Sequence, residues 1–366
     1  MEQGLKYVNN DACYPTIVCL GQIISYLKSE HVDPDRTAIF MSQTGGGCRA
    51  SNYISLLRKA LKDMHMEQIP VVSASMANLE QNQGFKVTLG LVKRFIMSFI
   101  YGDVLMRILY ATRPYEITKG SADALADKWA RVARMNVKSG NFIRFRMILN
   151  AMVKAFDQLP LQENVKKPKV GVVGEILVKY HPTANNDIVG VIEREGGEAV
   201  VPDLIDFFLY GMYSKEFNFT KLNGTYWTMI KNKLAILVIE LYRKPARKAL
   251  HGSERFEPPP FIHETAHKAQ EIVSLGNQCG EGWLLTGEMV ELIDSGVENI
   301  VCLQPFACLP NHVTGKGMMK ALRKRNPLAN IAAIDYDPGA SDVNQLNRIK
   351  LMMATAYKNL FNSRNN

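Results

Sequence analysis

The sequence predicts an α/β protein in which two parallel-sheet units are joined or surrounded by a helical segment. Three patterns support this fold class. Residues 38–75 follow the order strand, loop, helix, strand, which is typical of a small parallel α/β unit. Residues 84–157 repeat apolar side chains at helical spacing and contain few glycines or prolines. From residue 169 onwards, strand-like and helix-like segments alternate again.

The first unit is predicted to contain a helix that begins at the turn of residues 10–15. Asn10 or Asp11 can cap this helix, and Pro15 fits its first turn. A glycine-rich loop, residues 43–48, connects the next strand to the next helix. We expect strands at 5–9, 38–42 and 71–75, a helix from the turn to about 28, and a helix at about 49–65.

Residues 158–168 have the composition of a linker, so we place one domain at 1–160 and a second at 168–366, each with three cysteines. The second domain is predicted to resume the alternation of strands and helices, with a proline-rich loop at 252–260. We expect strands at 170–175, 199–202, 299–303 and 331–335, and helices at about 185–195, 204–248, 263–275, 283–295, 313–325 and 342–361.

The composition indicates a folded protein with a substantial core. The chain has 366 residues, of which 47% are apolar and 22% charged, and this length corresponds to roughly two domains. Its start lacks the pattern of a secretory signal, and apolar runs such as 234–241 are too short to span a bilayer. We therefore expect a cytoplasmic protein without a membrane segment, whose six cysteines are not structural disulfides.

The net charge of +9 is concentrated in two basic segments, 243–255 and 316–325. They indicate either a solvated helix face or a surface for a phosphate-bearing substrate or an acidic partner. Nucleic acid is not expected as a partner, because aromatic residues are not interleaved with the basic ones as a base-stacking surface requires.

The cysteines point most directly to a function. Helix starts and glycine-rich turns present backbone N–H groups. These groups stabilise a thiolate and can donate hydrogen bonds to cluster sulfides. Two of the cysteines also follow predicted strands, at the ends where open α/β sheets form their sites. We interpret four cysteines in loops or at predicted helix starts as ligands of a buried iron–sulfur site: Cys13, Cys48, Cys279 and Cys308.

The remaining two cysteines are less informative by themselves. Cys19 lies in a predicted helix and Cys302 inside an apolar strand, where free cysteines are commonly buried. The cysteine spacing matches neither the paired knuckles of a zinc site nor the short ferredoxin run. A nucleophilic Cys308 with His312 as its base is a further alternative. Neither 43–48 nor 315–317 completes an ATP-binding loop, so an ATP-driven step would need a separate protein.

Four segments carry a resemblance to a known family: NNDACYP at 9–15, QTGGGCRASNY at 43–53, GNQCGEGWLLTGEM at 276–289 and VCLQPFACLPNHVTGKG at 301–317. Together they resemble the signature segments of the 2-hydroxyacyl-CoA dehydratase and benzoyl-CoA reductase superfamily. Within it, the chain is most similar to double-cubane cluster proteins and to the dehydratase-like module of activase fusion proteins. The similarity spans nearly the whole chain.

The resemblance implies two flavodoxin-like domains and an oxygen-sensitive iron–sulfur protein. A separate actin-like, ATP-hydrolysing activase would supply a low-potential electron, which would pass to a 2-hydroxyacyl-CoA thioester or a small reducible molecule. Dehydratase subunits use three cysteines for one 4Fe-4S cluster, whereas six thiolates suit an 8Fe-9S double cubane, which we favour. The resemblance therefore implies that Cys19 and Cys302 are ligands as well. Separately, we expect a homodimer.

Three residues near the cysteines are candidates to tune the cluster: Glu281, Gln304 and His312. The alternatives are a charge favoured by a helix N-terminus for Glu281 and a surface residue at a helix start for His312. No general acid is assigned. The predicted function is a reductase or dehydratase component. The alternatives are an electron relay without a substrate pocket and a cluster-free α/β protein with buried thiols.

Overall fold

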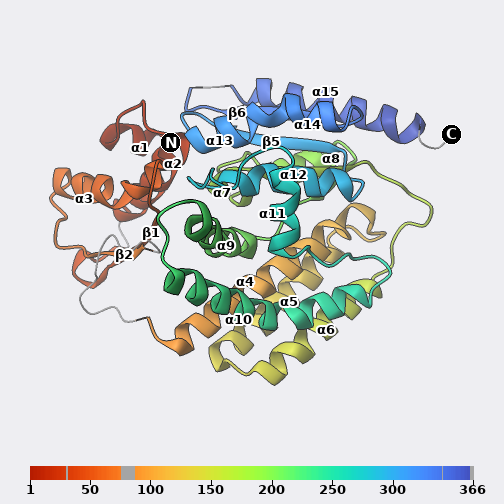
Figure 1. Cartoon of the computed structure of the whole chain (residues 1–366), viewed down its shortest axis with the longest axis horizontal. Coiled ribbons are helices and arrows are strands. Elements are labelled where there is room, and N and C mark those ends of the chain that lie inside the picture. The colour runs from red at the N-terminus through yellow and green to blue at the C-terminus, as the bar shows by residue number, and fades with distance from the viewer. Residues whose placement is uncertain (30–31, 76–86, 340, 363–366) are drawn as a thin grey trace.

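The computed structural model describes residues 1–29, 32–75, 87–339 and 341–362. It confirms a mixed α/β protein with two parallel sheets. Figure 1 shows the N-terminal unit on one side, the helices α4, α5, α6 and α10 below, and the C-terminal sheet with α15 above. The described chain therefore consists of a small α/β unit, a helical group and a larger α/β unit.

The N-terminal unit contains α1 (Glu2–Tyr7), α2 (Tyr14–Leu27), β1 (Ile39–Gln43), the turn η2 (Arg49–Ser51), α3 (Tyr53–Asp63) and β2 (Val71–Ser75). The two strands pair in parallel from Ile39 opposite Val71 to Gln43 opposite Ser75. The predicted strands at 38–42 and 71–75 and the helix that ends near 28 are confirmed. Residues 49–65 form the short turn η2 followed by α3.

The predicted strand at 5–9 is wrong, because these residues belong largely to α1 and to the turn after it. Two glycines let α1 and α2 cross closely. A Cβ atom on Gly4 would lie 2.1 Å from the carbonyl oxygen of Ile17, and one on Gly21 would lie 3.0 Å from the nitrogen of Gly4. This helix–helix packing decides the conformation of a segment whose local pattern is too short to distinguish strand from helix.

The helical group confirms the helices predicted for 84–157, apart from 84–86, which lie outside the described residues. It consists of α4 (Leu89–Tyr110), α5 (Ser121–Ser139), α6 (Phe142–Asp157), α9 (Ile205–Lys221), α10 (Tyr226–His251) and α11 (Ile262–Gln270). One hydrophobic core joins Phe145 and Phe156 to Leu209 and Trp283. Packing therefore crosses the predicted linker at 158–168.

By length and composition, one span in the described residues, Leu89–Tyr115, is apolar enough to cross a membrane. It comprises α4 and the turn after it, and 44% of its most apolar window is buried in the protein. Its side chains, including Met97 and Ile108, pack into the core of the helical group. Core helices of this kind pass the same test.

The C-terminal sheet has the order β4-β3-β5-β6, with all neighbours parallel. Its strands are β3 (Lys169–Gly174), β4 (Glu198–Val200), β5 (Asn299–Pro305) and β6 (Asn330–Tyr336). The helices α8 (Ile188–Arg194) and α15 (Asp342–Asn362) cover one face, and α12 (Gly282–Asp294) and α14 (Met319–Arg325) cover the other. The strand order reverses between β3 and β5, and open α/β sheets bind ligands outside the strand ends at such a point.

Two short helices follow these strand ends: α7 (Ile176–Tyr180) after β3 and α13 (Leu309–Thr314) after β5. The sequence did not predict α7. The helix predicted at 313–325 begins earlier and is divided into α13, the turn η4 (Lys316–Met318) and α14. The division falls at Gly315, where a Cβ atom would lie 2.5 Å from the carboxamide oxygen of Asn311.

Candidate site at the junction of the two sheets

Cys13 and Cys308 lie on two segments that are joined by a backbone hydrogen bond. Cys13 is the N-cap residue of α2, and Cys308 is the N-cap residue of α13. The amide of Tyr14 donates to the carbonyl oxygen of Phe306 at 3.0 Å. The N-terminal unit is therefore fastened to the loop at the carboxyl end of β5.

Cys48 and Cys279 come together on two glycine-rich loops. The amide of Gly47 donates to the sulfur of Cys279 at 3.4 Å. The Cβ position of Gly280 lies 3.9 Å from the sulfur of Cys48 and 2.8 Å from Pro310 of α13. Any side chain at position 280 would therefore collide with α13. These contacts bring the loops after β1 and before α12 to the same place as Cys308.

The thiols share this place with acidic groups that disfavour ionisation. Burial raises the pKa of the Cys48 thiol to about 11, and the charges of Glu281 and Cys13 also raise it. Burial raises the pKa of the Cys308 thiol as well, and Glu281 and Glu175 act in the same direction. Without a bound cation, these groups are held as neutral acids.

Glu175 and Glu281 form a buried pair of carboxyl groups, of which only Glu281 was predicted from the sequence. Burial and the charge of Glu281 raise the pKa of Glu175 to about 8. Each group also has a structural role: Glu175 accepts from the amide of Val178 at 3.0 Å, and Glu281 accepts from the amide of Ile176 at 2.8 Å. Glu281 is thus close to the cysteines, as predicted, but its observed hydrogen bond anchors α7.

The other two predicted cysteines have different surroundings. Cys19 lies near Cys13 and Glu175, whose charges add to burial in raising its pKa to about 12. Cys302 is fully buried among apolar side chains between the sheet and the helices α12 and α14. Its sulfur lies 3.8 Å from the carboxamide oxygen of Asn311. Cys48, Cys279 and Cys308 thus lie on neighbouring loops, and Cys13 and Cys19 lie in the adjoining N-terminal part of α2, whereas Cys302 faces a separate apolar layer.

Gln304 and His312 contact one another beside Cys308. The amide nitrogen of Gln304 lies 2.7 Å from Nδ1 of His312, which lies 2.8 Å from the carbonyl oxygen of Cys308. The carboxamide oxygen of Gln304 is buried without a hydrogen-bond partner. The pair therefore braces the first turn of α13, and neither side chain bonds to a cysteine sulfur.

Several residues of this region carried little sequence signal. The hydroxyl of Thr16 lies 2.9 Å from the sulfur of Cys13, and the hydroxyl of Tyr53 lies 3.9 Å from it. The hydroxyl of Thr44 lies beside the Cys48 thiol, and the hydroxyl of Tyr210 is buried without a hydrogen-bond partner. Glu175 could have been predicted from its position in the sequence, because it directly follows the carboxyl end of β3, where sites form in such sheets.

Cysteine thiolates are the ligands that hold iron–sulfur clusters, so the type of donor at this junction suits such a cluster. In the described part of the chain, no three His, Cys, Asp or Glu side chains are placed to hold one metal ion. A metal cluster would also reverse the effect of the crowded acids, because its positive charge stabilises thiolates.

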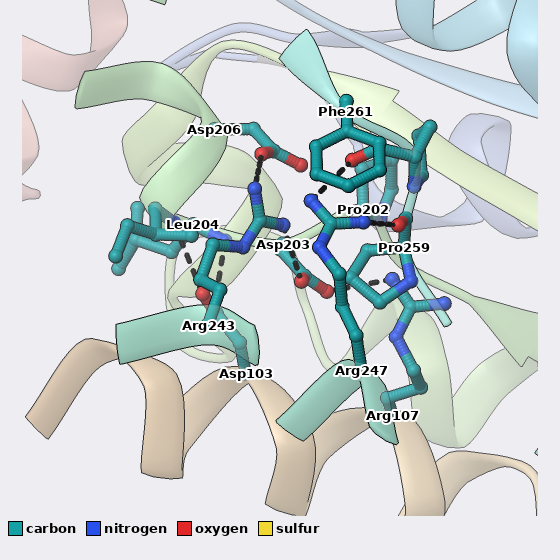
Figure 2. A network of polar contacts seen from close by, with 12 residues as sticks. Asp103, Arg107, Pro202, Asp203, Leu204, Asp206, Arg243, Arg247, Pro259 and Phe261 are labelled. Carbon is teal, nitrogen blue, oxygen red and sulfur yellow. Dashed lines mark hydrogen bonds and ion pairs between the residues drawn. The ribbon is translucent and has the colours of Figure 1, made fainter. Parts of the chain in front are cut away.

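A second group of buried charges lies between α4, α9 and α10. Figure 2 shows Arg243 between Asp203 and Asp206, with Arg107 bonded to Asp203 from another side. Burial raises the pKa of Asp206 to about 6. Asp103 accepts from the amides at the start of α9. This network fastens the helical group to the segment after β4.

The network also explains much of the basic segment at 243–255. Arg243 is 2% exposed, and Arg247 bonds Glu240 and the carbonyl oxygen of Pro260. In the segment at 316–325, Lys316 pairs with Asp335, and Arg325 pairs with Glu271 and Asp294. Much of the charge that suggested a partner surface is thus used within the protein.

A cavity of about 130 Å³ lies beside this network. Its lining includes Arg107, Asp206, Lys169 and Glu288. Glu288 also bonds Lys179 at 2.8 Å, and both side chains are 5% exposed. Because Lys179 is among the charges that act on Glu281 and Glu175, the cavity and the cysteine region are electrostatically connected.

The chain matches no protein-family model, and no curated protein or solved structure is similar to it at a level that indicates a relationship.

Proposed function

We propose that the chain is an iron–sulfur protein that accepts a low-potential electron from a separate ATP-hydrolysing activase and passes it to a bound substrate. The observation that supports this proposal is that contacts join the segments, far apart in the sequence, that carry four cysteines beside the carboxyl end of β5: Cys13, Cys48, Cys279 and Cys308. When bound, the cluster would supply one-electron chemistry at low potential.

The protein's own residues would bind, shield and orient the cluster. Gly47 supplies an N–H group toward sulfur, and the glycines on both loops let the backbone approach. Burial of Cys13 and Cys308 keeps water away from their sulfurs. If Glu175 and Glu281 ionise beside a bound cluster, their negative charge would disfavour reduction and suit a cluster that works at low potential.

The number of cubanes depends on Cys19 and Cys302. A 4Fe-4S cluster is satisfied by the four loop cysteines. The 8Fe-9S double cubane needs both further thiolates, and Cys302 would have to leave its apolar layer and its contact with Asn311. The family resemblance favours the double cubane, and the present position of Cys302 favours the single one. Iron content per chain distinguishes them.

We infer that the larger sheet is flavodoxin-like. Its order β4-β3-β5-β6 corresponds to 2-1-3-4 within the unit, the first part of the 2-1-3-4-5 order of that fold. The two-stranded sheet β1-β2 is too small to support the same inference for the N-terminal unit.

For the reaction, we propose 2-hydroxyacyl-CoA dehydration or reduction of a small molecule, with an electron relay as the alternative. The cavity of about 130 Å³ favours an enzyme, because it offers space within reach of the buried Lys179–Glu288 pair. Turnover of 2-hydroxyacyl-CoA esters or small reducible compounds, with activase and ATP present, distinguishes the two. Electron acceptance without turnover of any compound would favour the relay.

The ligand assignment is tested by single Cys-to-Ala variants purified and reconstituted without oxygen. Cys48→Ala and Cys308→Ala should lose the charge-transfer absorbance of the cluster and most of the iron. Cys302→Ala is the matched comparison: it retains iron if one cubane is bound and loses it if two are bound. Full iron content in both Cys48→Ala and Cys308→Ala would contradict the proposed site.

A further inference from the structure

Tyr210 of α9 carries a buried hydroxyl for which the protein supplies no hydrogen-bond partner. Its side chain is 3% exposed. An unpaired buried hydroxyl is destabilising, and native proteins satisfy nearly all such groups. The Tyr210 hydroxyl is therefore free to donate to an acceptor from outside the polypeptide.

The hydroxyl lies against the turn that presents Cys279. The Cβ position of Gly282 is 2.3 Å from the Tyr210 oxygen, so only glycine leaves room for the hydroxyl there. Gly282 has a φ of +46°, and its amide donates to the carbonyl oxygen of Cys279 at 3.0 Å. Burial raises the pKa of Tyr210, and the charges of Glu281, Cys279 and Cys48 act in the same direction. The phenol therefore lies at the edge of the cysteine region.

Neighbouring aromatic rings hold the phenol in this orientation. The Trp283 ring meets the Tyr210 ring edge-on at 5.0 Å between centroids. The Trp283 side chain is itself fixed, because its Nε1 donates to the hydroxyl of Ser214 at 3.1 Å. Phe207 packs at 6.1 Å on the same helix. Tyr210 thus cannot turn away to reach water without repacking the core.

We propose that the Tyr210 hydroxyl donates a hydrogen bond to a sulfur atom of the cluster site and thereby raises the reduction potential of the bound cluster. This inference rests on the proposed function. Hydrogen bonds to sulfur stabilise the more negative, reduced form, and they are one of the means by which proteins set cluster potentials. The same bond would satisfy the unpaired hydroxyl. Tyr210 acts here as a positioning and tuning residue and takes no part in bond breaking.

The test is a potentiometric titration of the reconstituted protein, followed by the EPR signal of the reduced cluster. Tyr210→Phe removes only the hydroxyl, so the ratio of reduced to oxidised cluster at a fixed potential should fall about tenfold, or about 59 mV for one electron. Tyr101→Phe is the matched control, because Tyr101 is equally buried but bonds Asn136 at 2.9 Å in the helical group. Its potential should equal that of the wild type.

A second variant covers the case in which Tyr210→Phe does not retain a cluster. Replacing Tyr210 with 3,5-difluorotyrosine preserves the shape and strengthens the O–H donor, so the potential should rise above that of the wild type. Unchanged potentials in both Tyr210 variants that carry a cluster would overturn this inference alone. A wild-type protein that binds no cluster would overturn the proposed function, and this inference with it.

Discussion

The amide of Gly47 donates to the sulfur of Cys279 across 232 positions of sequence, at 3.4 Å. This contact links the loop after the small sheet to the loop before α12. The adjacent Gly46 has a φ of +78°, and a Cβ atom there would also lie 3.4 Å from the Cys279 sulfur. The conformation of one loop therefore controls the surroundings of a cysteine on the other.

Gly46→Ala is predicted to destabilise the protein by about 1–2 kcal/mol, because alanine is strained at positive φ, and to lower its iron content. Gly102→Ala provides the control. Gly102 lies in α4 with no heavy atom within 4 Å of its Cβ position, so alanine should stabilise the helix by about 0.5–1 kcal/mol. Guanidinium denaturation measures both changes. Equal stability of the two variants would contradict the prediction.

Arg243→Met is predicted to destabilise the protein by about 3–5 kcal/mol, because it leaves the buried carboxylates of Asp203 and Asp206 without their shared cation. Lys59→Met removes an ion pair of similar length, with Asp63, on the exposed face of α3. That change should stay within about 0.5 kcal/mol. The midpoint of denaturant unfolding compares them, and a small loss for Arg243→Met would show that the network contributes little.

Glu175→Gln is predicted to change the pH dependence of stability in the metal-free protein. Burial, followed by the charge of Glu281, raises the pKa of Glu175 from its ordinary 4.5 to about 8. The stabilisation that this group gives is complete below about pH 4.5 and is lost as the pH rises through 8. Glutamine does not titrate, so the variant should gain stability relative to the wild type as the pH rises.

The measurement is the unfolding free energy of both proteins at pH 4.5, 6 and 8. A difference between variant and wild type that stays the same at all three pH values would show that Glu175 is not the group that titrates.

We predict that the expected homodimer forms through the outer face of α10. Leu234, Leu237 and Leu241 recur at helical spacing there and are 56%, 65% and 59% exposed. A contiguous exposed apolar patch of this kind marks an interaction site. Leu237→Asp combined with Leu241→Asp should convert the protein to a monomer in light-scattering measurements. Ile143→Asp, at a 70% exposed position on α6, should not. A dimer that survives the double substitution lies on another surface.

The sequence predicted the elements that local pattern determines. The β-type run at 299–303 was correct because it forms a continuously buried apolar strand, and the run at 71–75 was correct as well. The prediction of a strand at 5–9 was wrong because the conformation there depends on the close packing of α1 on α2 at two glycines, which is a tertiary effect. The prediction of one continuous helix at 313–325 was wrong for a similar reason, because the break at Gly315 depends on the position of Asn311.

The candidate site was predictable only in part. Cys48 and Cys308 could be placed at strand ends from their positions after strands, and Glu281 could be placed beside Cys279. Tyr210 lies in the middle of a helix, and nothing local distinguishes it from a core tyrosine. Its proposed role can be inferred only from the three-dimensional structure, which places its hydroxyl against Gly282, three residues after Cys279.

The most direct test of the central claim is the iron and acid-labile sulfide content of the wild-type protein, purified and reconstituted without oxygen. We predict about four irons per chain for a single cubane, or about eight for a double cubane, with an EPR signal after reduction. Reconstituted protein with neither iron nor sulfide would contradict it.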